Sequence, residues 1–134
     1  MRAWGWAMAA AVMLAAAPMA EAADPVMSLA GSEWGFASET GEHQRFVQFS
    51  QEGLLSGHGG CNHFGGGYTQ KDAELTIEGL ISTRMACAAD VMTAEDAFLR
   101  ALEASHHIEA THTALKIFGA DGAVLLDLVR RDAD

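Results

Sequence analysis

The sequence predicts an α+β domain built on a curved antiparallel sheet of about seven or eight short strands with one amphipathic helix. Short runs that alternate apolar and polar side chains recur between glycine-rich turns, which is typical of strands. One segment in the C-terminal third changes to a three- and four-residue apolar spacing, which is typical of a helix packed on a sheet.

The clearest strand covers residues 74–82, where Leu75, Ile77 and Ile81 share one face. Residues 57–68 are dense in glycine, and their spacing fits neither a phosphate-binding loop nor a dinucleotide fingerprint. Glycines in such a segment indicate bulges, bends or close backbone approach. Asp121-Gly122 predicts a hairpin turn. Further strands are expected at 33–38, 45–51, 54–58, 107–111, 114–118 and 123–130.

The helix is predicted to begin at Thr93 as its N-cap and to run for about 12 residues. Glu95 and Asp96 then fall in its first turn, where the helix dipole favours negative charge. Five aromatic side chains are expected to lie largely in the core: Trp34, Phe46, Phe49, Phe98 and Phe118.

The N-terminus indicates export. A positive start, a short apolar run and the triplet Ala20-Glu21-Ala22 predict a secretory signal peptide over residues 1–22. The alternative, a membrane anchor, is disfavoured because the run is shorter than the roughly 20 residues a span requires. We expect residues 23–28 to be a flexible lead-in, residues 29–131 to form the domain, and the mature protein to be periplasmic or secreted without a membrane anchor.

The charge excludes several partners. The formal net charge is −10 over 134 residues, and an acidic domain repels nucleic acid and anionic lipid. The two cysteines, Cys61 and Cys87, indicate a disulfide in an oxidising compartment, worth roughly 3–4 kcal/mol, with two buried free thiols as the alternative.

No catalytic constellation is found in the sequence, so no enzyme and no cofactor is predicted. The best candidate metal cluster is His58, Cys61 and His63, whose residue types suit zinc or copper. Because a disulfide would consume Cys61, no metal site is predicted.

An ordered set of motif residues extends through nearly all of the predicted domain. It comprises Leu29, Gly31, Ser32, Trp34, Gly57, Gly60-Cys61-Asn62, Phe64, Gly66, Tyr68, Leu75, Ile77, Leu80, Thr83-Arg84-Met85-Ala86-Cys87, Met92, Glu95, Phe98, Leu102, Leu115 and residues 126–130. In this combination the chain resembles the META domain of HslJ-like heat-inducible envelope proteins.

The resemblance implies a strongly curved antiparallel sheet or incomplete barrel packed against one helix. It implies no catalytic residues, and it implies a connection with envelope stress, secretion or drug tolerance. Four motif residues beside the cysteines are either structural or part of a small-ligand site: Gly60, Asn62, Thr83 and Met85. The structural interpretation is favoured, with Asn62 in a left-handed or turn conformation and Thr83 bonded to nearby backbone.

The expected function is therefore that of a non-enzymatic interaction or accessory module that binds an envelope protein. The alternative is a carrier of a small apolar ligand or lipid inside an incompletely closed barrel. An enzyme or metal protein is the third hypothesis.

Overall fold

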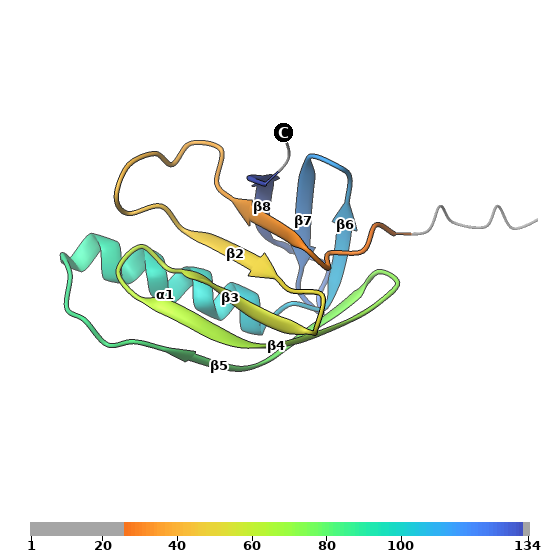
Figure 1. Ribbon diagram of the computed structural model, residues 1–134, viewed down its shortest axis with the longest axis horizontal. Coiled ribbons are helices and arrows are strands. Elements are labelled where there is room, and N and C mark those ends of the chain that lie inside the picture. The colour runs from red at the N-terminus through yellow and green to blue at the C-terminus, as the bar shows by residue number, and fades with distance from the viewer. Residues whose placement is uncertain (1–25, 133–134) are drawn as a thin grey trace, which may run out of the picture.

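The computed structural model describes residues 26–132. These residues form eight antiparallel strands that close into a barrel, with one helix alongside (Figure 1). The predicted α+β class is confirmed. The elements are β1 (Ser32–Gly35), β2 (Phe46–Phe49), β3 (Leu54–His58), β4 (His63–Lys71), β5 (Glu74–Ser82), α1 (Ala89–Glu103), β6 (His107–Ala110), β7 (Ala114–Phe118) and β8 (Val124–Arg130). The predicted signal peptide, residues 1–22, and the start of the lead-in lie outside the described residues.

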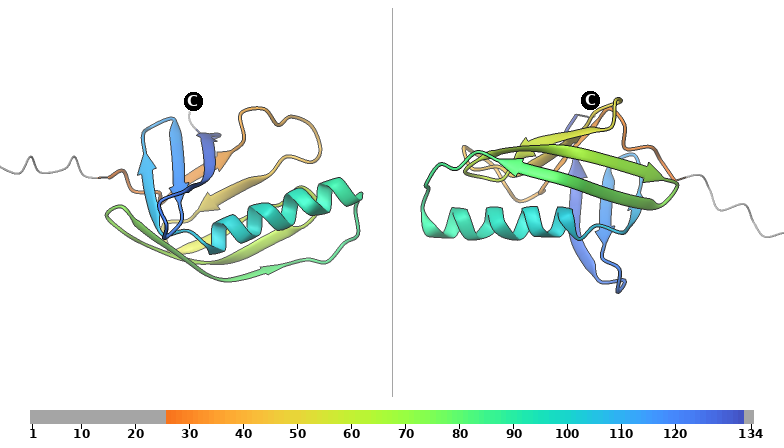
Figure 2. Two further views of the ribbon diagram at one scale, coloured as in Figure 1. Left: turned by 180° about the vertical axis from the view of Figure 1, so that it is seen from behind. Right: turned by 90° about the horizontal axis from the view of Figure 1, so that it is seen from below.

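Each strand pairs with its neighbour in sequence, and β8 returns to pair with β1. The ring is closed, whereas the resemblance left open an incomplete barrel. Its weakest joint is between β5 and β6, where the register contains the single pair Glu74 and His107. The helix α1 connects these two strands and runs alongside the long β4–β5 hairpin (Figure 2).

The inward faces of the strands and one face of α1 form a single apolar core. Trp34, Phe49 and Phe98 are its largest fully buried side chains. Phe46 and Phe118, expected largely in the core, are only half-buried, because each stands at the end of its strand. The core also contains Leu29, Val47, Leu55, Phe64, Leu75, Ile77, Leu102, Ile108, Leu115, Ile117, Leu126 and Leu128.

One bulge prediction and one turn prediction are confirmed. The register between β4 and β5 shifts between Gly65 and Gly67, which is the expected glycine-rich bulge. Asp121 and Gly122 form the turn between β7 and β8, where the Asp121 carboxylate accepts the N–H of Ala123 at 3.1 Å.

The predicted helix start is wrong. α1 begins at Ala89, its N-cap is Ala88, and no side chain caps it. Thr93 lies inside the helix and donates its hydroxyl to the carbonyl of Ala89 at 2.9 Å. A residue that looks like a cap by composition is here a helical residue whose hydroxyl is satisfied four residues back. Among residues 26–132, no helix is both long and apolar enough to cross a membrane.

Candidate binding surface

Three segments meet at one end of the molecule. They are the turn between β3 and β4, which contains Cys61 and Asn62, the helix α1, and the strap, residues 83–88, which links β5 to α1. A disulfide joins Cys61 to Cys87 across 26 positions of sequence, so the predicted pairing is present. The strap and the turn are thereby covalently joined.

Glu95 of α1 holds the turn. Its carboxylate accepts the backbone N–H of Cys61 at 2.9 Å, the N–H of Asn62 at 2.6 Å and the Asn62 side-chain amide at 2.8 Å. Although it is charged, Glu95 is only 6% exposed. A carboxylate that accepts several N–H groups in a buried place is fixed in position, because each bond opposes rotation of the side chain.

The sequence of the turn makes room for this carboxylate. A β-carbon at Gly59 would lie 2.4 Å from the Glu95 side chain, so only glycine fits there. Gly60 adopts φ +107°, a conformation that other residues rarely take. Gly60 also donates its N–H to Nδ1 of His58 at 3.0 Å. The two glycines therefore allow the chain to bring two successive N–H groups toward one acceptor.

Asn62, which Glu95 binds, also binds the strap. Its Oδ1 accepts the hydroxyl of Thr83 at 3.0 Å and the N–H of Met85 at 2.6 Å, and its amide donates to the carbonyl of Met85 at 3.3 Å. Asn62 is buried in the turn between β3 and β4 and is not in the left-handed conformation, so of the two conformations expected for it the turn is the one present. It is a bridge between turn and strap, and Thr83 bonds to its side chain and not to backbone.

The electrostatics agree with this geometry. Burial by itself raises the pKa of Glu95, but the bonds from Asn62 and Cys61, with a smaller contribution from His58, outweigh burial and hold that pKa below its ordinary value. Glu95 is therefore ionised at neutral pH. Burial lowers the pKa of His58, and His63 and His43 lower it further against the opposing effect of Glu95. His58 is therefore neutral at pH 7.

The candidate metal cluster is divided. His58 and His63 face each other across β3 and β4 with ring centroids 4.7 Å apart, but Cys61 belongs to the disulfide. Nδ1 of His58 is engaged by Gly60. Within the described range, no group of three or more histidine, cysteine or acidic side chains is placed to hold a metal ion.

Exposed apolar side chains lie on the strap and on the two elements that it joins, β5 and α1. A shallow depression of about 360 Å³ is lined by Thr83, Arg84, Met85, Met92 and Asp96, among others. Met85 and Met92 are 57% and 41% exposed, and Ile81, just before the strap, is 77% exposed. We call Ile81, Met85 and Met92 together the strap face.

Of the four residues predicted beside the cysteines, Asn62, Thr83 and Met85 are joined by hydrogen bonds, and Gly60 lies in the same turn as Asn62. The role of Glu95 was not predicted, because Glu95 was assigned to the helix dipole. A signal was available: Glu95 stands three and seven positions before the buried Phe98 and Leu102, so it shares their face of the helix.

This chain is similar to known proteins in its sequence and in its fold. The META domain family matches residues 27–132. The solved structures similar to this chain include an NMR structure of a protein from Burkholderia xenovorans, 22% identical, with a TM-score of 0.67 over 78% of this chain and 85% of that chain. Another is the crystal structure of a DUF4847 family protein from Bacteroides vulgatus, 14% identical, with a TM-score of 0.56 over 79% and 96% of the two chains. No match was found among curated proteins.

Proposed function

Since this chain belongs to the META domain family, we propose that it is an exported, non-enzymatic interaction module that binds an envelope protein through the strap face. The process it serves is one of those linked to the resemblance: envelope stress, secretion or drug tolerance. The observation that carries the proposal is a group of exposed apolar side chains next to a cross-linked frame. We define the frame as the Cys61–Cys87 disulfide with Asn62 and Glu95 and the hydrogen bonds that these two side chains make.

Three of the five large apolar side chains that are exposed among the described residues belong to the strap face, and the other two, Leu54 and Val124, lie on β3 and β8. Ile81 is 77% exposed and Met85 is 57% exposed, although the core elsewhere buries side chains of the same kind. Burial of such side chains against a partner releases about 25 cal/mol for each Å² of apolar surface. Methionine adapts its shape to different partners, which suits a surface that docks another protein.

The frame reduces the entropic cost of binding. Met85 is held at its N–H and its carbonyl by Asn62, and the disulfide at Cys87 lies two residues farther along. A segment that is already ordered loses less conformational freedom when a partner binds it. The ordered strap therefore favours specific binding of one partner over weak binding of many partners.

The state of Glu95 supports a non-enzymatic role. It is the one acidic side chain among those described that is buried, and its carboxylate accepts three N–H groups. An acid or base in catalysis must exchange its proton with substrate, whereas Glu95 remains ionised and occupied. The disulfide is consistent with an extracytoplasmic protein.

The alternative, carriage of an apolar ligand within the barrel, is less well supported. The inward positions of all eight strands contribute to one packed cluster, with Trp34, Phe49 and Phe98 among its members. A ligand inside the barrel would have to displace these side chains. Native mass spectrometry of the purified protein tests this alternative, since a co-purifying lipid would support it.

Photocrosslinking in intact cells tests the proposal. A photoreactive amino acid replaces Met85 in one variant and Val124, an apolar residue of β8 that is 55% exposed, in the control. We expect a discrete envelope protein to be crosslinked from position 85 and not from position 124. The same products from both positions, or none from either, would overturn the proposal.

A further inference from the structure

The strap carries one exposed basic residue that no other described residue binds. Arg84 lies between Thr83 and Met85, both bound by Asn62, yet no hydrogen bond or ion pair among residues 26–132 engages Arg84. Every residue from position 81 to position 86 is exposed. From residue 83 the chain is neither helix nor strand, and it runs along one end of the molecule (Figure 1).

The chemical surroundings of Arg84 are acidic. It is the single cation among the residues that line the depression beside the strap, which also contain Glu95 and Asp96. The whole chain has a formal net charge of −10. A partner that binds the strap through Arg84 must therefore accept one guanidinium group on an irregular backbone segment, without relying on a broad basic patch.

A serine endopeptidase of trypsin type has this chemistry. Its specificity pocket carries a carboxylate that pairs with Arg or Lys, and its groove binds a short extended segment. We propose that the strap is a recognition loop for such an endopeptidase, with Arg84 in the specificity pocket. This inference rests on the proposed interaction surface and names its partner class.

The frame determines the outcome of attack on the Arg84–Met85 bond. The enzyme's serine oxygen forms an ester with the Arg84 carbonyl carbon, and the Arg84–Met85 peptide bond breaks. The Met85 nitrogen leaves as an amine after it takes the serine hydroxyl proton from the enzyme's histidine. Water can then hydrolyse the ester to the Arg84 carboxylate. In a free peptide the amine would diffuse away before the reverse attack.

In this chain the new ends are retained. The cleaved bond lies between Cys61 and Cys87, so the disulfide still joins the two pieces. Asn62 still holds Thr83 on one side and Met85 on the other. The Met85 amine therefore remains beside the ester, and its return attack reforms the peptide bond and releases the serine. The loop acts as a slowly consumed inhibitor and not as an ordinary substrate.

Inhibition assays with the oxidised, exported protein test this inference. Trypsin is the probe, and chymotrypsin, whose pocket is apolar, is the matched enzyme control. We expect inhibition of trypsin only. Arg84→Ala should weaken it by at least about thirtyfold, the scale of an interface hot spot, while Arg84→Lys retains it. Arg100→Ala, at another exposed arginine, should change nothing.

Mass spectrometry of the mixture gives a second readout. We expect slow cleavage at Arg84–Met85 alone, in a product that separates into two pieces only after reduction. Rapid degradation of the folded protein, or unimpeded trypsin with an intact strap, would overturn the inference. If position 85 still crosslinks its partner in Arg84→Ala, the interaction surface stands and the protease assignment fails. If position 85 gives no crosslinked protein, and trypsin is neither inhibited by the strap nor cleaves it, both proposals fail.

Discussion

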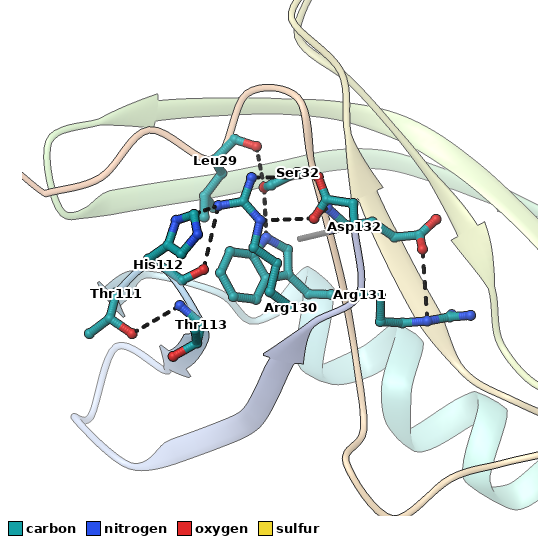
Figure 3. A network of polar contacts seen from close by, with 10 residues as sticks. Leu29, Ser32, Thr111, His112, Thr113, Arg130, Arg131 and Asp132 are labelled. Carbon is teal, nitrogen blue, oxygen red and sulfur yellow. Dashed lines mark hydrogen bonds and ion pairs between the residues drawn. The ribbon is translucent and has the colours of Figure 1, made fainter. Parts of the chain in front are cut away.

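Two carboxylates in this molecule bind backbone N–H groups, and they differ in their surroundings. Glu95 lies under the turn between β3 and β4 and is 6% exposed. Asp132, beyond the end of β8, is exposed; it accepts the N–H of Glu33 at 3.1 Å and Nε of Arg130 at 2.9 Å (Figure 3). Both have a pKa below the ordinary value, Asp132 chiefly through its bond from Arg130.

The contribution of such a hydrogen bond to stability depends on whether water can replace it. Around Glu95, water cannot replace a lost partner, so each donor left behind would be buried and unsatisfied. Around Asp132, water can replace either partner, and salt screens the charges. The end of the molecule that holds the strap is therefore fixed by polar contacts, whereas the C-terminal end is fixed by the apolar faces of β7 and β8.

The largest effect is expected from removal of the disulfide. Replacing Cys61 and Cys87 together by alanine frees a loop of 26 positions. The denatured state gains chain entropy, which lowers the free energy of unfolding by about 3.5 kcal/mol. Urea denaturation measures this loss. Because Asn62 holds Met85 independently, the amide of Met85 should keep its protection from hydrogen exchange. A strap that exchanges freely in the variant would show that the disulfide alone fixes it.

The next largest effect is expected at Glu95. Glu95→Gln keeps the shape but places an amide against donors, and it removes the charge, so stability should fall by about 2 kcal/mol. Thermal or urea unfolding measures the change. Asp96→Asn, an exposed neighbour on the same helix, is the control and should stay within about 0.5 kcal/mol. Equal effects at both positions would show that the buried contacts of Glu95 contribute no more to stability than an exposed carboxylate does.

Acid should weaken the end that holds the strap. The pKa of His58 is lowered in the folded state, so its contribution is present above pH 6.5, the ordinary value, and is lost as pH falls below it. The pKa of Glu95 is also lowered, so its contribution is present above pH 4.5 and is lost as pH falls through the folded value. Unfolding measured from pH 7 to pH 3 should show both losses. Glu95→Gln should remove the second and keep the first.

The smallest effect is expected at the C-terminal end. Asp132→Asn should change the free energy of unfolding by no more than about 0.5 kcal/mol, since exposed ion pairs contribute little. The same urea measurement, repeated at high salt, should reduce any difference from the parent protein. A loss as large as that of Glu95→Gln would mean that Asp132 is not replaced by water.

Much of the fold could be predicted because alternation marks a strand wherever one of its faces is buried. Leu75 and Ile77 of β5 gave such a signal, and both are buried. Ile81, predicted on the same face, is 77% exposed, because the alternation shifts at Gly79, which has φ +66°, and Leu80 packs against the core instead. Closure of the ring could not be predicted. It depends on Trp34 meeting Arg130 and on Glu74 meeting His107, and these pairs are set by the curvature of the whole sheet.

The site was predicted in part. The cysteines and Asn62 could be recognised as a group because they lie within family motifs. Thr83 and Met85 were recognised with them because they belong to the motif that ends at Cys87. Glu95 could not be separated by composition from a solvated first-turn acid. Its partners are backbone N–H groups, which every residue except proline has and no sequence pattern marks. The early start of α1 was missed for a related reason, since Ala88 offers no capping side chain.

The pairing of β8 with β1 has a consequence for how the molecule assembles. All other strand pairs join neighbours in sequence, and the longest connection among them is the one that contains α1. The last pair brings together positions 34 and 130, almost the full length of the domain. A chain that has formed β1 to β7 still has an open edge on β1, with N–H and C=O groups ready to pair with another molecule. Closure by β8 is the late, entropically costly step that ends this exposure, so the folding rate should depend on β8 more than on any other strand.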